Sequence, residues 1–142
     1  MDAVDLKERT MQFSLRIGKL IDALPRRKVG RSVEDQLGRA GTSVGANYRA
    51  ACKARSRKEF IAKIGIVEEE ADESAFWLEF VIRSGLLKPP LVEPLLNESI
   101  ELGRIFAKSR MTASTNESTK RVTRSNPANR QSAMGNGQST RS

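Results

Sequence analysis

The sequence predicts an all-α protein, an antiparallel up-down-up-down four-helix bundle followed by a disordered C-terminal tail. Three observations lead to this prediction. Apolar residues recur at helical spacing in four separate segments. Proline and glycine interrupt the chain between these segments, and the short connectors favour antiparallel neighbours. The composition then changes near Thr112, after which large apolar residues almost disappear.

The first helix is expected from about Val4 to Leu24. The residues of its apolar stripe are Phe13, Ile17, Leu20, Ile21 and Leu24. Pro25 ends this helix, because proline disfavours helical geometry in the residue before it. The segment from Pro25 to Arg31 is then a short, strongly basic connector.

The second helix is expected to begin near Ser32 as its N-cap, with Glu34 and Asp35 in the first turn, where negative charge suits the helix dipole. Its apolar stripe comprises Val33, Leu37, Ala40, Val44, Tyr48 and Ala51. Small residues cluster in its middle at Gly38, Gly41, Ser43, Gly45 and Ala46. Since glycine costs about 1 kcal/mol in a helix interior relative to alanine, this cluster indicates either a closely packed neighbouring helix or a local kink. We favour close packing, because small residues alternate with aliphatic ones.

The third helix is expected to begin near Arg57, after the Ser-x-x-Glu capping box of Ser56 and Glu59, and to end before Gly85. Three aromatic residues lie beside its apolar stripe, Phe76, Trp77 and Phe80. They either cover the end of the bundle or form a subunit interface, where aromatic residues are enriched. We favour the interface.

The fourth helix is expected from about Val92 to Lys108, with Pro94 in its first turn, where proline is tolerated. The bundle would therefore occupy residues 4–110. Residues 111–142 are rich in Ser, Thr, Asn and Arg and hold too little apolar surface to offset the entropy of ordering, so a disordered basic tail is expected there.

The charge of the chain is strongly basic, with 25 Lys and Arg against 17 Asp and Glu, a formal net charge of +8. In an antiparallel bundle the basic residues of the two connectors that flank the second helix lie at opposite ends, separated by roughly 35 Å. The first pole comprises Arg26, Arg27, Lys28 and Arg31, and the second comprises Arg49, Lys53, Arg55, Arg57 and Lys58. These poles are the candidate nucleic-acid-binding residues, and we expect weak, sequence-independent contact with phosphate.

The chain contains one cysteine, Cys52, and no histidine. A Ser-His or Cys-His catalytic pair is therefore excluded, and a zinc site is not expected. The sequence predicts no catalytic residue, no metal and no cofactor. A single cysteine suits a reducing compartment, and the segment from Met1 to Glu8 lacks the apolar core of a signal peptide, so a cytoplasmic location is expected, with no membrane association.

A polar cluster is expected between the second and third helices, where Arg39 could meet Glu70 and Glu73, joined by Asn47. A buried cluster of this kind would fix the register of the two helices. The surrounding acidic run, which also holds Glu68, Glu69 and Asp72, is either a solvated face or a surface that pairs with the basic pole of a neighbouring subunit. The second alternative predicts a ring-forming homo-oligomer whose assembly depends on salt.

The chain resembles the family called four-helix bundle protein, or 23S-rRNA intervening-sequence protein. The residues that carry this resemblance are Arg39-Ala40, Ser43-Val44, Ala46-Asn47, Ser56, Lys58-Glu59-Phe60, Glu70-Ala71-Asp72-Glu73 and Trp77-Leu78-Glu79. It covers about Leu6 to Ile105. Where the family pattern places an acidic residue and a glycine after the asparagine, this chain has Arg49, Ala50 and Ala51, which makes the surface more basic. The resemblance implies a helical bundle. A related branch, the accessory variability proteins of diversity-generating retroelements, implies a basic pentameric ring that binds a reverse transcriptase and nucleic acid.

The sequence therefore predicts a non-enzymatic, oligomeric four-helix bundle with an accessory role in binding RNA or DNA, and the resemblance adds a reverse transcriptase as a candidate partner. The alternative is a protein-protein adaptor or assembly protein that does not touch nucleic acid. RNA that copurifies with the protein would favour the first function over the second.

Overall fold

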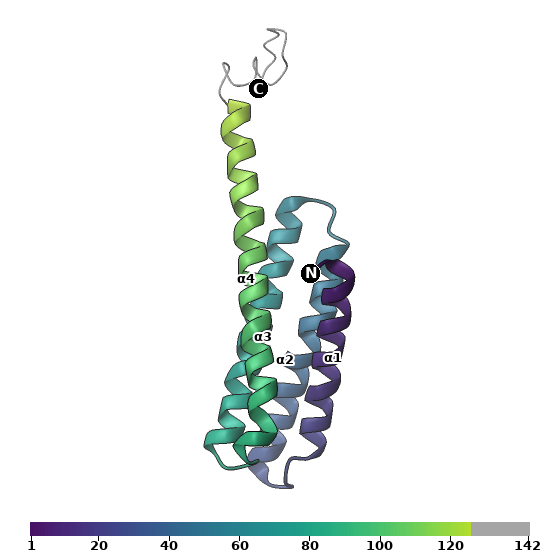
Figure 1. Ribbon diagram of the computed structural model, residues 1–142, viewed down its shortest axis with the longest axis vertical. Coiled ribbons are helices and arrows are strands. Elements are labelled where there is room, and N and C mark those ends of the chain that lie inside the picture. The colour runs from purple at the N-terminus through teal and green to yellow at the C-terminus, as the bar shows by residue number, and fades with distance from the viewer. Residues whose placement is uncertain (126–142) are drawn as a thin grey trace.

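The computed structural model describes residues 1–125, and side chains as far as Asn116. Within this range the chain forms four helices and no strand: α1 (Ala3–Asp22), α2 (Lys28–Cys52), α3 (Arg57–Arg83) and α4 (Pro89–Ser125). Figure 1 shows the helices lying side by side, with the α1–α2 and α3–α4 connectors at one end and the α2–α3 connector at the other. The predicted all-α, up-down-up-down bundle is confirmed.

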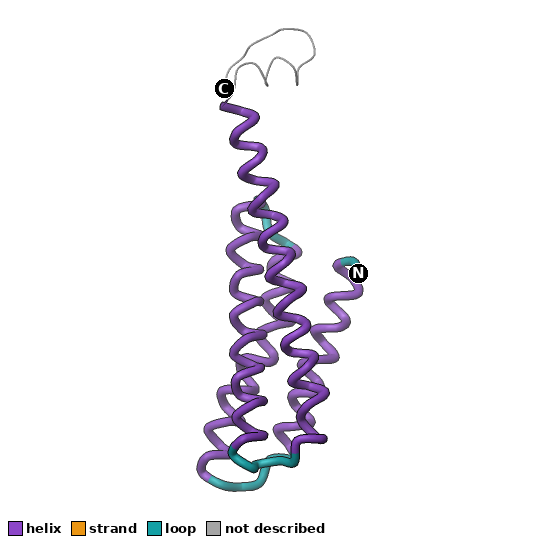
Figure 2. Tube along the Cα trace, turned by 60° about the vertical axis from the view of Figure 1, so that its left-hand side comes forward, coloured by secondary structure: helices purple, strands orange, loops and turns teal. Residues whose placement is uncertain are grey.

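The helices pack in chain order around one core. α2 packs against α1 and α3, α3 packs against α4, and the contact between α1 and α4 is the sparsest. Figure 2 shows this arrangement from a second direction, with connectors only at the two ends. The largest fully buried side chains are Phe13, Ile17, Val33, Leu37, Val44, Ile64, Val67, Leu78, Val81, Val92, Leu102 and Phe106. Tyr48, predicted on the stripe of the second helix, is buried, and its ring centroid lies 5.3 Å from that of Phe106.

The small residues of α2 allow α1 to approach closely. A Cβ atom added to Gly41 would lie 2.8 Å from the side chain of Ile17, and one added to Gly45 would lie 3.4 Å from Thr10. The predicted close packing is therefore confirmed. Because the gap admits only a hydrogen at Gly41, the α1–α2 pair is fixed in register at this crossing.

The start of α1 and the end of α3 are each fixed by a local capping feature. Asp2 caps α1 by accepting a hydrogen bond from the Asp5 amide at 2.9 Å, and this bond holds the pKa of the Asp2 carboxyl below its ordinary value. Gly85 has a φ of 74° directly after the C-cap of α3, as predicted for a residue that ends a helix in the left-handed region.

The fourth helix is longer than predicted at both ends. It begins at Pro89, so Pro94 lies beyond the first turn rather than within it. It also continues past Lys108 to Ser125, beyond the expected boundary at residue 110, and Figure 1 shows it projecting past the α2–α3 connector. No proline or glycine follows Gly103 in this helix, and Ala113 is still buried, so nothing local stops it. The predicted disorder of the tail from residue 126 onward falls outside the described residues.

Candidate nucleic-acid interface

The first basic pole lies on the N-terminus of α2. The helix begins at Lys28, and Arg27 is its N-cap, with extended backbone (φ −133°, ψ 161°). The Arg31 amide donates to the Arg27 carbonyl at 3.1 Å, which closes the first helical turn. Arg26 precedes this turn, and all four cations are exposed. The pole that the sequence predicts as a connector is therefore half connector and half helix.

The predicted N-cap of α2 was wrong. Ser32 lies one turn inside the helix and exposed, and Glu34 and Asp35 fall in the second turn instead of the first. The cause is a short-range contact between the connector and the first turn of the helix. Gly30 is buried under the connector, and a Cβ atom there would lie 2.6 Å from the Pro25 carbonyl oxygen. The absence of a side chain lets the chain turn tightly at Pro25 and start the helix one turn early.

This helix start is electrostatically unfavourable for folding. The first turn of α2 contains no acidic residue, and within residues 1–125 its N-cap forms no side-chain cap hydrogen bond. A helix N-terminus carries partial positive charge and prefers acidic neighbours. Here it meets Arg27, Lys28 and Arg31 instead. Cations, free N–H groups and the helix dipole together create a surface that attracts anions.

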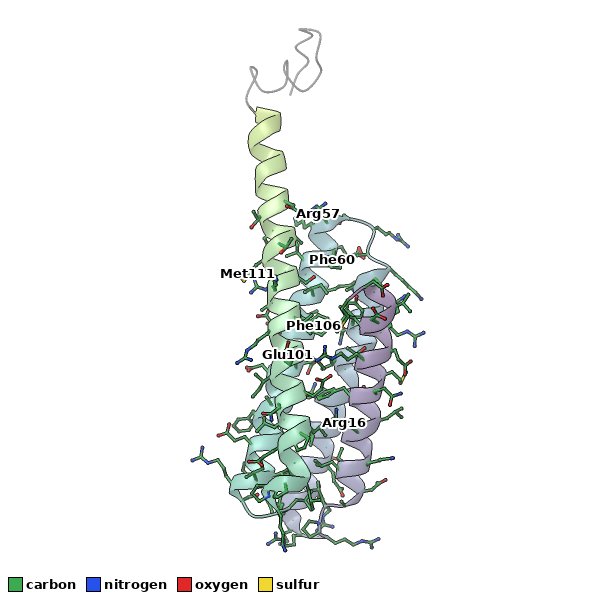
Figure 3. The ribbon with its side chains drawn as sticks, viewed as in Figure 1. Arg16, Arg57, Phe60, Glu101, Phe106 and Met111 are labelled. Atoms are coloured by element: carbon green, nitrogen blue, oxygen red, sulfur yellow. The ribbon has the colours of Figure 1, made fainter. Side chains whose placement is uncertain are left out.

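The second pole lies at the opposite end of the bundle and has a different local structure. Arg49 lies in the last turn of α2 and Lys53 is its C-cap, positions where positive charge suits the helix dipole. Ser56 caps α3 by accepting from the Glu59 amide at 3.0 Å, and Glu59 supplies an acid in the first turn. Only this half of the predicted capping box is formed. Figure 3 shows Arg57 at this end of the molecule, beside α4.

The basic residues of both poles are exposed to solvent. The residues that the structure places on the surface at these ends are Arg26, Arg27, Lys28, Arg31, Arg49, Lys53, Arg55, Arg57 and Lys58. Apart from Arg57, none of them forms an ion pair or a side-chain hydrogen bond with the described residues. The charge of the other eight is therefore available to an external anion.

The acidic run of α3 is mostly engaged within the chain. Arg39 donates to Glu73 at 2.6 Å and to Glu70 at 3.5 Å. The hydrogen bond to Glu73 raises the pKa of the Arg39 guanidinium above its ordinary value. Arg39 is half exposed rather than buried, and Asn47 does not join the cluster, because its side chain donates to the Ser43 carbonyl at 2.9 Å.

A further pair was missed by the sequence analysis. Arg110 of α4 donates to Glu68 at 2.6 Å across the α3–α4 contact. Only Glu69 and Asp72 of the acidic run are exposed. Together with Arg104 and Arg110 they line an open groove of about 710 Å³ between α3 and α4. Arg9 and Glu98 form a similar two-bond pair, at 2.7 and 2.8 Å, between α1 and α4. Neither pair is signalled by local spacing.

The three aromatic residues of α3 form one cluster. The rings of Phe76 and Trp77 meet edge to face at 5.0 Å, and those of Trp77 and Phe80 at 5.6 Å. Trp77 and Phe80 rest partly buried against the core, whereas Phe76 is 58% exposed. Part of the cluster is therefore core packing, and Phe76 presents an apolar ring to the outside.

Two further properties bear on the chemistry of the chain. Across residues 1–125, no group of three or more Cys, Asp or Glu side chains is arranged to hold a metal ion. In the same range no helix combines the length and apolar character needed to cross a membrane.

The comparisons with known proteins place this bundle among its relatives. No curated protein matches the chain. Among solved structures, it is similar to a protein of unknown function from the S23 ribosomal protein family of Bacteroides thetaiotaomicron, with 34% identity and a TM-score of 0.69 over 73% of this chain and 96% of that one. The model of the family described as 23S rRNA-intervening sequence protein matches residues 3–108, which are nearly the whole of the packed bundle. The chain therefore belongs to the 23S rRNA-intervening sequence protein family.

Proposed function

We propose that this protein is a non-enzymatic accessory protein of the cytoplasm that binds nucleic acid, and RNA in particular, through the phosphate backbone. One observation carries the proposal. Four exposed cations surround the N-terminus of α2, which has no side-chain cap and no acid in its first turn. This arrangement costs folding stability, so it calls for a reason other than folding.

A polyanion supplies such a reason. Phosphate groups accept hydrogen bonds from arginine, from lysine and from the N–H groups at a helix N-terminus, and each contact releases condensed counterions. Arg26, Arg27 and Lys28 form no ion pair with the described residues, so no internal bond must break before they bind. The second pole adds five more cations at the far end of α2.

The family supports RNA as the nucleic acid. Its description refers to intervening sequences in 23S rRNA. A base could stack on an exposed aromatic ring near one of the poles. Tyr48, the aromatic residue considered for this role, is buried and cannot stack on a base. Binding therefore depends on charge and not on base identity.

The test is filter binding of a structured RNA at two salt concentrations. The triple variant Arg26→Gln/Arg27→Gln/Arg31→Gln should bind at least about tenfold more weakly at low salt, with a salt slope reduced by about two to three. The matched control is Arg83→Gln/Arg104→Gln/Lys108→Gln, which removes the same charge from exposed positions of α3 and α4. Equal loss in both variants, or affinity that salt does not change, would contradict the proposal.

The exposed ring of Phe76 favours a second candidate, assembly with other protein chains. The Phe76, Trp77 and Phe80 cluster would form a homo-oligomer interface, with a pentameric ring and a reverse-transcriptase partner as in the related retroelement branch. An adaptor that binds protein and no nucleic acid is the alternative. Light scattering of the wild type and of Phe76→Ser, at low and high ionic strength, tests this assembly, and a monomer under all conditions would rule out the ring.

A further inference from the structure

We propose that the ligand of the two poles is a double helix, bound lengthwise along the exposed face of α2 so that both ends of the bundle contact its phosphates. This inference rests on the proposed function and specifies its ligand. It comes from the register of the basic residues on a single helix.

Both poles of α2 lie on the same side of that helix. Its exposed face comprises Lys28, Arg31, Asp35, Arg39, Thr42, Ala46, Arg49 and, at the C-cap, Lys53. Arg31 and Arg49 are separated by 18 residues (49 − 31), which is five turns at about 3.6 residues per turn, so they point in the same direction. Lys28 and Lys53 are 25 residues apart (53 − 28), close to seven turns.

The spacing of Lys28 and Lys53 is close to the repeat of a B-form double helix. At about 1.5 Å per residue, Arg31 and Arg49 are about 27 Å apart along the axis, and Lys28 and Lys53 about 37 Å apart. One turn of a B-form duplex spans roughly 34–36 Å. A B-form duplex aligned with α2 therefore presents the backbone of the same strand near Lys28 and near Lys53, one turn apart.

The middle of the face is compatible with a duplex groove. Thr42 and Ala46 are small and uncharged, and the charge of Arg39 is balanced by Glu70 and Glu73. Asp35 is the acid of this face, and it lies near the first pole. Positive charge is thus concentrated at the two places where phosphates recur, with little in between.

The second pole also gains a cation from α1. Lys7 and Arg49 line the same shallow hollow of about 340 Å³ between α1 and α2. A rigid duplex that touches both poles makes the second contact without a further loss of conformational entropy. A flexible single strand loses conformational entropy when it is ordered to span the two poles. The geometry therefore favours a duplex over a single strand.

The experiment measures the affinity of the full-length protein for DNA hairpins, whose stems are B-form, with stems of 6, 10, 14 and 18 base pairs. Affinity should rise at least about tenfold between the 6- and 14-base-pair stems and then level off, and the salt slope should roughly double. RNA hairpins of the same lengths and an unpaired RNA of matched length are parallel arms. An RNA stem that binds like the DNA stem supports a backbone contact common to duplexes.

Single-pole variants sharpen the result. Lys28→Gln/Arg31→Gln and Arg49→Gln/Lys53→Gln should each abolish the rise with stem length, while Arg104→Gln/Lys108→Gln, at exposed positions of α4 outside the exposed face of α2, should keep it. Binding that does not depend on stem length, or that favours the unpaired RNA, overturns the lengthwise duplex and leaves the proposed function standing. Absence of binding to every nucleic acid at low salt overturns both.

Discussion

The two ends of α2 carry charge of the same sign but meet opposite ends of the helix dipole. At the C-terminal end, Arg49 and Lys53 lie where carbonyl groups point outward, so their charge contributes to folding. At the N-terminal end, Lys28 and Arg31 lie where N–H groups point outward, and no cap or acid offsets them. Folding accounts for the first pair of cations and does not account for the second.

This difference shows that two basic segments that look alike in the sequence can have opposite effects on folding stability. In the sequence, both poles are basic residues near a helix boundary. The structure separates them, because the direction of the helix decides whether a cation stabilises its end. The N-terminal pole is therefore the stronger indicator of a ligand, and three stability measurements can break or sharpen this conclusion.

The largest effect is expected at Gly30. Substitution Gly30→Ala places a Cβ atom against the Pro25 carbonyl oxygen, so the backbone of the connector must move. The free energy of unfolding should fall by about 1–3 kcal/mol. Gly18→Ala is the matched control, since nothing lies within 4 Å of its added Cβ, and it should stabilise by up to about 1 kcal/mol. Urea denaturation of both variants measures the difference, and a neutral Gly30→Ala would show that this contact does not set the start of α2.

The next effect concerns the caps of α2 and α3. Arg27→Ser supplies the missing N-cap of α2 and should raise the free energy of unfolding by about 1 kcal/mol, whereas Ser56→Ala removes the existing cap of α3 and should lower it by a similar amount. Thermal and urea unfolding give both values. If Arg27→Ser destabilises the protein, the N-terminus of α2 is satisfied in another way, and the comparison fails.

The smallest effect is a charge reversal at each end of α2. Lys28→Glu should stabilise the protein by about 0.3–1 kcal/mol, and Lys53→Glu should destabilise it by a comparable amount, because the dipole changes sign between them. Both changes should shrink as salt is added. Effects of the same sign at the two ends would show that overall net charge, and not the helix dipole, governs stability.

Local patterns predicted most of the bundle. The apolar stripes gave the four helices, and the buried residues Phe13, Leu37 and Leu78 lie where helical spacing places core residues. The C′ glycine Gly85 and the N-cap Ser56 were also predictable, because each acts on its own neighbours in the chain.

The candidate site was only partly predictable. The poles were found from composition, and the Arg39–Glu73 contact from antiparallel packing. The Arg110–Glu68 pair was missed, because its partners are 42 residues apart and the helix was expected to end near residue 108. The absence of Asn47 from the cluster depends on a side-chain hydrogen bond to its own helix that no spacing rule signals.

The sequence by itself determined that four amphipathic helices form and that cations gather at the connectors, since apolar periodicity and charge are properties of neighbouring residues. Tertiary structure alone decided that Arg110 pairs with Glu68, since these residues are 42 apart in the chain. Only the folded backbone shows that α2 begins one turn before Ser32, where Gly30 packs against Pro25. Because of this extra turn, Lys28 and Arg31 lie on the helix N-terminus and not in the connector. Glu34 and Asp35 lie in the second turn and not in the first, where they would have offset the positive end of the helix dipole.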